Sequence, residues 1–254
     1  MGVTRKPFQG VYNIIRFNWH FYVLAIAFLL LLLAAIKMID SSFAIFGWVA
    51  FYLILSSISI SLFASFYIYD LSGLYKLNWL DGLLHKDYST ILNIHAGFDE
   101  TSGLLHSKYK PSKLIVFDFY NPAFHTEISI KRARKVYPPY PGTKKMSTNY
   151  LPVENDSIDT SFAILAAHEI RKEDERILFF KELNRITKKD GQIVVVEHLQ
   201  DVANFLAYNI GFFHFHTKAT WLKTFSAAGL RVQKEIKITP FITTFILQKN
   251  GSTP

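Results

Sequence analysis

The chain has 254 residues, which is enough for one α/β domain and an additional anchor but too few for two large domains. It contains no cysteine, and this excludes disulfides, thiolate metal sites and cysteine nucleophiles. The formal net charge of +8 fits either nucleic acid or an anionic bilayer surface as a partner.

Two long uncharged runs near the N-terminus predict a transmembrane helical hairpin. They cover residues 21–36 and 43–69, and about 20 apolar residues suffice to cross a bilayer. We therefore expect transmembrane helices over about 20–39 and 43–69, within an N-terminal segment that ends at residue 70. The short connection from Asp40 to Ser42 allows only an antiparallel pair, and a lipid bilayer becomes the simpler partner.

Two other interpretations of these runs stay open. The first run could be a cleaved signal peptide, although a second and longer apolar run follows it directly. Both runs could instead be buried core helices, although the second has 27 consecutive uncharged residues.

The flanking charges predict the orientation of the hairpin. Arg5, Lys6 and Arg16 precede the first helix, whereas the connection holds only Lys37 and Asp40. The positive-inside rule then places both termini and the following domain in the cytoplasm, as parts of an integral membrane protein.

Leucines at near-helical spacing predict a linker helix over residues 71–90. Tyr75 and Trp79 would suit a helix that lies on the membrane surface. A helix that packs on the sheet of the following domain explains the same spacing, and both interpretations can hold together.

From residue 91 to residue 254, short β-rich segments alternate with helical ones. We expect buried strands over 91–96, 113–118, 161–166 and 192–197. Strands that alternate with helices are typical of a doubly wound, mostly parallel sheet. The sequence therefore predicts an α/β domain.

Two further features complete the predicted domain. Residues 173–187 have the spacing of an amphipathic helix, and Asp190 with Gly191 is expected to end it in a turn. Strands over 231–239 and 241–249, separated by a proline, predict a C-terminal antiparallel hairpin.

Three segments of this domain share their order and spacing with a known family. Residues 151–159, Leu-Pro-Val-Glu-Asn-Asp-Ser-Ile-Asp, are similar to its LPF-x-D-x-SFD segment. Residues 179–191 are similar to its EL-x-RVLKPGG helix and turn, and residues 221–230 to the helix and AGF turn before its last hairpin. On these segments, the chain from about 91 to 249 resembles class I S-adenosylmethionine-dependent methyltransferases that act on small molecules and lipids.

The resemblance implies a seven-stranded sheet, S-adenosyl-L-methionine as cofactor and a cofactor loop after the first strand. The family pattern there is roughly LD-x-G-x-G-x-G. In this chain Asn93 replaces the acid, His95 and Asp99 stand at two glycine positions, and Gly97 is retained. Glycines in such a loop let the backbone approach a ligand closely.

Further cofactor contacts follow from the same resemblance. Asp118, followed by Phe119, stands where the family's acid accepts hydrogen bonds from the ribose. Asn149 and Tyr150 stand where the family often contacts adenine. A turn or helix-capping role is the alternative for Asp118.

Polar residues at two strand ends are candidates for catalysis. His168 follows the fourth predicted strand, and Glu197 with His198 ends the fifth. A histidine there could take a proton from a hydroxyl or an acidic carbon, or the three groups could simply satisfy strand ends. His214 and His216 lack a convincing third ligand, so we expect no metal site.

Two surface segments suggest partners. The apolar residues 202–215 would cover the acceptor pocket in the related fold, which suits a lipophilic acceptor, although added core packing is an alternative. The basic residues 131–135 match no nucleic-acid recognition motif. They fit a solvated helix face or contact with anionic headgroups.

Together these features predict a membrane-anchored methyltransferase that acts on a lipophilic small-molecule acceptor and binds no nucleic acid. A degenerate methyltransferase-like domain that serves as a binding or scaffold component is the alternative, because the glycine loop is altered. A nucleotide-dependent oxidoreductase is disfavoured because the glycine fingerprint is missing. The oligomeric state and the methylated atom are not predicted.

Overall fold

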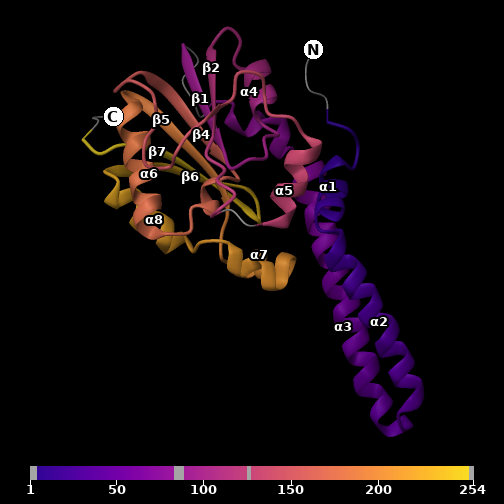
Figure 1. Ribbon diagram of the computed structural model, residues 1–254. Coiled ribbons are helices and arrows are strands. Elements are labelled where there is room, and N and C mark those ends of the chain that lie inside the picture. The colour runs from indigo at the N-terminus through magenta and orange to yellow at the C-terminus, as the bar shows by residue number, and fades with distance from the viewer. Residues whose placement is uncertain (1–4, 83–88, 125–126, 252–254) are drawn as a thin grey trace.

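The computed structural model describes residues 5–82, 89–124 and 127–251. Figure 1 shows an α/β domain from whose side a pair of long helices projects. Helix α1 (Gln9–Phe17) lies at the junction, followed by α2 (Trp19–Met38) and α3 (Ser41–Phe66) of the projecting pair.

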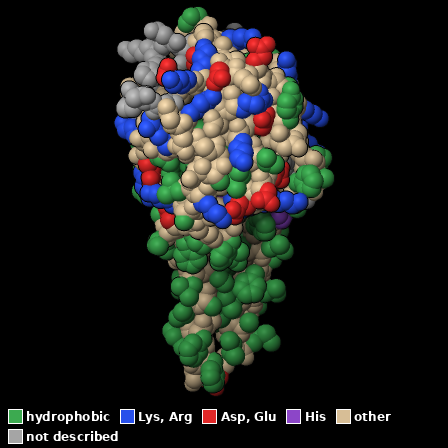
Figure 2. All heavy atoms as spheres, turned by 90° about the vertical axis from the view of Figure 1, so that its left-hand side faces the viewer, with side chains coloured by type: hydrophobic (Ala, Val, Ile, Leu, Met, Phe, Trp, Pro, Cys, Tyr) green, Lys and Arg blue, Asp and Glu red, His purple; other side chains and the backbone are tan. Residues whose placement is uncertain are grey.

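Helices α2 and α3 are long and apolar enough to cross a membrane by length and composition, and most of their side chains are exposed. The projecting part carries hydrophobic side chains along its visible face, whereas the domain above it carries mixed charges (Figure 2). The connection between α2 and α3 consists of Ile39 and Asp40, whereas the sequence predicts a connection from Asp40 to Ser42. Asp40 caps α3 by accepting a hydrogen bond from the Ser42 backbone N–H at 2.9 Å, so the helix begins at Ser41.

After α3 the chain continues through a π-helical turn, η1 (Tyr67–Leu71), into two short 3₁₀ turns, η2 (Leu74–Lys76) and η3 (Asn78–Leu80). The predicted continuous linker helix is therefore wrong over its described part, and its part over residues 83–88 lies outside the described residues. Gly73 and Leu77 have left-handed backbone angles that interrupt it.

The leucines of this linker nevertheless have a buried face. Leu74, Leu77 and Leu80 pack in one core cluster with Ile91 and Phe162 of the sheet. This burial supports the expectation that the linker packs on the domain.

The sheet has seven strands in the order β3-β2-β1-β4-β5-β7-β6. Strands β1 to β5 run parallel, and β7 is antiparallel to both β5 and β6. The predicted doubly wound, mostly parallel sheet with a C-terminal antiparallel hairpin is confirmed. The strands are β1 (Thr90–His95), β2 (Lys113–Asp118), β3 (Lys144–Lys145), β4 (Ile158–Ile164), β5 (Thr187–His198), β6 (Leu230–Thr239) and β7 (Ile242–Lys249).

Helices cover both faces of the sheet, which explains why its central strands are apolar throughout. Aromatic residues of α6 and α8, such as Phe180 and Trp221, fill the core on one face. The other face is covered by the linker, α4 and the base of α3. The helices of the domain are α4 (Ser102–Lys108), α5 (Ile128–Val136), α6 (Glu173–Ile186), α7 (Val202–Tyr208) and α8 (Lys218–Ala227), with 3₁₀ turns η4 (Ala167–Glu169) and η5 (Asn209–His214).

Strand β5 begins earlier than predicted. Asp190 and Gly191 lie inside the strand and not in a turn before it, because Thr187 already pairs with Ile158. A register shift follows this pair, and a Cβ on Gly191 would lie 2.8 Å from the carbonyl oxygen of Asp159. The glycine therefore permits a close backbone approach at an irregularity of the sheet.

Helix α1 is held at the junction from two sides. Both carboxylate oxygens of Asp70 accept hydrogen bonds, from the backbone N–H groups of Gly10 and Val11, each at 2.8 Å. On the domain side, Arg132 of α5 donates to the carbonyl oxygen of Phe17 at 2.6 Å. Helix α1 therefore adds a second connection between the base of the projecting pair and the domain, besides the direct packing of α3 on the sheet.

Replacing the Asp70 carboxylate should loosen this junction. Asp70→Ala leaves two amides in the first turn of α1 without their acceptor, which we expect to cost about 1 kcal/mol. Hydrogen exchange of the detergent-purified chain should show faster exchange at residues 10–13 only. The control Asp81→Ala removes an exposed carboxylate paired with Lys108, and equal protection of α1 in both variants would contradict the capping role.

Candidate functional site

A cavity of about 240 Å³ lies between α1, α5 and the carboxyl ends of β1 and β4. Parallel sheets of this kind bind ligands at the carboxyl edge of their strands. Phe98 and Glu100 line the cavity from the loop after β1, and His168 and Glu169 line it from η4. Asn13 and Phe17 of α1 line it from the junction with the projecting helices.

The loop after β1 is internally bonded. Asp99 caps α4 by accepting hydrogen bonds from the N–H groups of Thr101 and Ser102, at 3.0 and 2.9 Å. Asn93 is fully buried and donates through its amide to both hydroxyls, of Thr101 at 3.0 Å and of Ser102 at 2.8 Å. Asn93 therefore anchors the start of α4.

Several features of this loop fit a bound polar cofactor. Asn93 Oδ1, His95 Nε2 and Asp99 Oδ2 are buried and have no hydrogen-bond partner among the described residues. Gly97 has a φ of 92°, and a Cβ there would lie 2.8 Å from an Arg134 nitrogen. Burial lowers the pKa of His95, so its ring is neutral and its Nδ1 accepts from the Gly97 N–H at 3.1 Å.

Asp118 ends β2 beside this loop, and its carboxylate forms an ion pair with Arg134 of α5. Arg134 Nη1 lies 2.6 Å from Asp118 Oδ2 and also donates to the Gly97 carbonyl oxygen at 3.1 Å. A ribose bound to Asp118 would have to displace this guanidinium. The Arg134 side chain is 30% exposed, so it has room to swing out.

None of the eight predicted cofactor residues is among those that line the cavity, although Ala96, Phe98, Glu100 and Thr101 of the loop after β1 are. Phe119 is buried in the core, where its ring centroid lies 5.6 Å from that of Phe179. Asn149 and Tyr150 are exposed and do not line the cavity. Their contact with adenine stays a prediction.

His168 and Glu197, predicted from separate strand ends, form a buried pair. The fully buried Glu197 accepts from His168 Nδ1 at 2.5 Å and from the His168 backbone N–H at 3.2 Å. Burial would lower the pKa of His168, but the carboxylates of Glu197 and Glu169 outweigh it and raise this pKa to about 10. A positive charge is therefore favoured beside the cavity.

His198 has a different environment, although it also lines the cavity. Its Nδ1 lies 3.0 Å from Asn204 Oδ1 and 3.1 Å from the carbonyl oxygen of Phe241, so Nδ1 carries the proton. Its Nε2 accepts from the Tyr69 hydroxyl at 2.9 Å. Burial lowers the pKa of His198 to about 4, and the ring is neutral.

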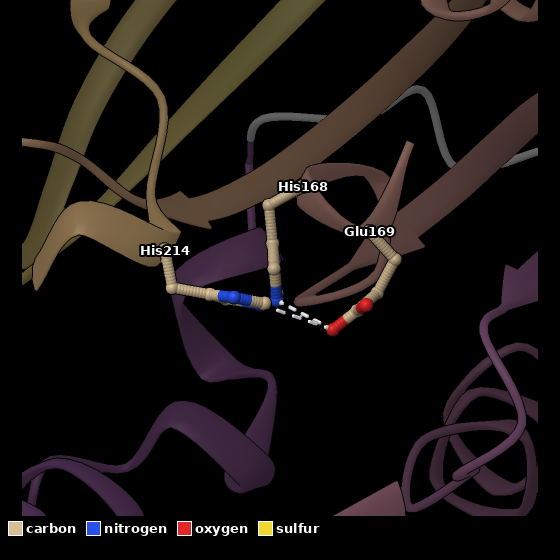
Figure 3. A group of neighbouring side chains, drawn as sticks. All are labelled: His168, Glu169 and His214. Carbon is tan, nitrogen blue, oxygen red and sulfur yellow. Dashed lines mark hydrogen bonds and ion pairs between the residues drawn. The ribbon is translucent and has the colours of Figure 1, made fainter. Parts of the chain in front are cut away.

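The structure adds residues that the sequence interpretation missed. Figure 3 shows the Glu169 carboxylate facing the rings of His168 and His214 from one side. Its Oε1 atom lies 3.4 Å from His168 Nε2 and 3.3 Å from His214 Nε2. Glu127, at the start of α5, lies 2.8 Å from His214 Nδ1. The adjacency of Glu169 to His168 was a usable signal, whereas nothing in the sequence pointed to Glu127.

His216 is not part of this group. Its Nε2 lies 3.3 Å from Arg176 Nη1, and its ring packs on Trp221. Burial, together with Arg176 and Arg171, lowers the pKa of His216 to about 4. His214 and His216, which are only two positions apart in the sequence, therefore lie in two different environments.

No protein-family model and no curated protein matches this chain. Among solved structures, the PH0226 protein from Pyrococcus horikoshii OT3 is similar over 69% of this chain and 90% of its own, with a TM-score of 0.51 and 14% identity. A SAM-dependent methyltransferase from Aquifex aeolicus is similar over 70% and 93%, with a TM-score of 0.48 and 16% identity. An S-adenosylmethionine-dependent methyltransferase from Clostridium acetobutylicum ATCC 824 is similar over 70% and 90%, with a TM-score of 0.49 and 11% identity. The match to the Pyrococcus structure supports the fold and nothing further.

The burial of His198 predicts how it titrates, and its hydrogen bonds predict which tautomer it keeps. Its folded-state pKa of about 4 lies below the ordinary histidine value near 6.5. The unfolded chain therefore binds more protons as the pH falls below 6.5, and stability declines from pH 6.5 towards pH 4. In a ¹⁵N-histidine NMR titration, His198 should keep a protonated Nδ1 and a bare Nε2 from pH 8 to pH 5. A His198 signal that titrates above pH 6 would contradict this assignment.

Proposed function

We propose that this protein is a membrane-anchored, S-adenosylmethionine-dependent methyltransferase that acts on a lipophilic or membrane-associated small molecule. The observation that carries the proposal is the place of the cavity. Its walls include Ala96, Phe98 and Glu100, which alternate with the predicted cofactor residues His95, Gly97 and Asp99 in the loop after β1, and residues of α1, the helix that lies between the domain and the two apolar helices. A single cavity can thus connect a cofactor site with an acceptor from the bilayer.

S-adenosylmethionine supplies an electrophilic methyl group on a sulfonium when it is bound. The residues that would hold it are the unpartnered polar atoms of the loop 93–99, the backbone at Gly97 and the carboxylate of Asp118. The names of structural neighbours from Aquifex aeolicus and Clostridium acetobutylicum agree with this cofactor.

Membrane anchoring is supported by the exposed apolar surface of α2 and α3. Side chains such as Leu31, Met38 and Phe46 are 70% to 88% exposed. Apolar surface in water costs roughly 25 cal/mol per Å² relative to an apolar environment, so both helices favour hydrocarbon. In this proposal α2 and α3 span the bilayer, with the domain and both termini in the cytoplasm.

A lipophilic acceptor is supported by α7 and η5. Helix α7 packs beside α3, at the end of the domain near the base of the projecting helices (Figure 1). Together α7 and η5 expose several apolar side chains. These side chains belong to Val202, Phe205, Leu206, Ile210 and Phe213. They would lie in the membrane interface and shield an acceptor that moves between the bilayer and the cavity.

The cavity-lining histidines take different parts in this proposal. His168 carries positive charge beside the cavity and can pair with an anionic oxygen of the acceptor, while Glu197 positions its ring. His198 holds the end of β5 through Asn204 and Tyr69. Methyl transfer gains much of its acceleration from positioning, which a rigid cavity provides.

A non-catalytic membrane scaffold is the second candidate, and one observation favours it. The ion pair between Arg134 and Asp118 closes the ribose position in the absence of ligand. If the pair never opens, the loop after β1 is only a structural connection.

Cofactor binding separates the two candidates. Calorimetry on the detergent-purified chain should detect S-adenosylmethionine, and Asp118→Ala should weaken binding by more than tenfold because the ribose loses its acceptor. Arg134→Ala should bind at least as tightly as the wild type, because it removes the competitor for Asp118. Asp190→Ala is the matched control on an exposed acid. Transfer of a labelled methyl group into the organic phase of a membrane lipid extract then tests the acceptor class.

If calorimetry detects no heat of binding at millimolar S-adenosylmethionine, in both the wild type and Arg134→Ala, the methyltransferase proposal is ruled out. The non-catalytic membrane scaffold is then the candidate that stays. Binding without any labelled lipid-phase product would instead contradict the lipophilic acceptor alone.

The membrane topology can be mapped cleanly because the chain has no cysteine. Ser41→Cys places a thiol at the tip of the α2–α3 pair, and Lys181→Cys places one on the exposed face of α6. In sealed inside-out vesicles, a membrane-impermeant maleimide should label Lys181→Cys but not Ser41→Cys. Intact spheroplasts should show the reverse pattern. Labelling of both thiols from one side would contradict a spanning hairpin.

A further inference from the structure

We propose that His168, Glu169 and His214 form a binding site for a divalent transition-metal ion of the zinc type, at the wall of the cavity. The three residues come from the turn after β4 and from the end of η5, and their ligand atoms all lie within 4.8 Å of one another. Figure 3 shows their polar atoms converging on one point.

Two of the three separations between the donor atoms match tetrahedral coordination, and the third, between the two histidine nitrogens, is at most 4.8 Å. Zinc binds histidine nitrogens and carboxylate oxygens at about 2.0–2.2 Å, so two ligands on a tetrahedron lie about 3.3–3.5 Å apart. Glu169 Oε1 lies 3.4 Å from His168 Nε2 and 3.3 Å from His214 Nε2. Both separations are long for a hydrogen bond and are already suitable for a shared metal ion.

In both histidines a carboxylate lies beside Nδ1, the ring nitrogen that faces away from the proposed ion. Glu197 accepts from His168 Nδ1 at 2.5 Å, and Glu127 lies 2.8 Å from His214 Nδ1. Metal-ligating histidines almost always bond through the second ring nitrogen to a carboxylate or carbonyl, which fixes the tautomer and aims the free nitrogen at the metal. Two such pairs that face a third carboxylate form a metal site with its supporting shell.

The local charge also favours a cation. Three carboxylates, from Glu127, Glu169 and Glu197, surround two imidazole rings. This excess of carboxylates would attract a divalent ion to the point that the ligand atoms face.

The positive charge of Arg171 would repel a metal ion bound at this site. Its guanidinium donates to the carbonyl oxygen of His214 and also contacts Nδ1 of the same ring, where it competes with Glu127 for that nitrogen. It lies on the exposed side of the cluster, so it can move away when a metal binds. A cation so close to a ligand ring must lower metal affinity by electrostatic repulsion.

Three protein ligands leave the fourth position of a tetrahedral ion open, as in catalytic zinc sites. Glu127, His168 and Glu169 all line the cavity, so this position would be available to an oxygen of a ligand there. Resting on the proposed methyltransferase function, the ion would hold and acidify a hydroxyl group of the acceptor.

Metal binding is measured without cofactor, so that its outcome is independent of the proposed function. The untagged, chelator-treated chain in detergent should bind one Zn²⁺ by calorimetry. Co²⁺ should give the visible absorption of a four-coordinate histidine–carboxylate site. The affinity should fall at least tenfold in Glu197→Gln, because His168 loses its supporting carboxylate, and further in Glu169→Gln and His214→Ala.

Two further variants make the test specific. Arg171→Gln should bind Zn²⁺ more tightly, because it removes the opposing charge. The control His106→Ala removes an exposed histidine of α4 and should bind as the wild type does. His214 is partly exposed, so His214→Ala keeps the test valid even if a change at the buried His168 prevents folding.

Absence of stoichiometric Zn²⁺ binding in the wild type would overturn the site. So would an unchanged affinity in both Glu169→Gln and His214→Ala. With the metal bound, methyl transfer to a hydroxyl-bearing acceptor should be lost on chelation and restored by Zn²⁺. Transfer that survives chelation would overturn the acceptor role alone.

Discussion

The two long helices expose apolar side chains, whereas the surface of the domain is charged, and the short helix α1 packs against both parts where they meet. Asp70 binds the start of α1 to the base of α3, and Arg132 binds its end to α5. Glu100, in the loop after β1, strengthens the joint by accepting from Arg5 at 2.6 Å and from Tyr75 at 2.8 Å. Because α1 also lines the cavity, the site exists only when the anchor and the sheet are held together.

The carboxyl edge of the sheet divides into two polar regions with different properties. Around Asp118 and Arg134, opposite charges pair directly and close the surface. Around His168, Glu169 and His214, carboxylates outnumber the cations that face them and favour an added positive charge. The cavity is lined by His168 and Glu169 of the second region and by neither Asp118 nor Arg134 of the first.

The altered glycine loop has a consistent structural explanation. Asn93 and Asp99 together satisfy the start of α4, which frees the backbone there from needing the family's glycine-rich turn. Gly97 is retained where Arg134 and Tyr120 leave no space for a side chain. The loop is thus held by Asn93 and Asp99, and the Asp118 carboxylate beside it is paired with Arg134.

The sequence by itself determined the hairpin, the α/β class, the bounds of β2 and the C-terminal antiparallel strands, because each follows from a local pattern of apolar residues. It also placed His168 and Glu197 at strand ends. Only the tertiary structure decided that the linker is two short turns, since burial of Leu74 and Leu77 against the sheet overrode helical spacing. The same holds for the group of Glu127, Glu169 and His214: their positions come from loops of different strands and meet only because the strand order brings those loops to one edge.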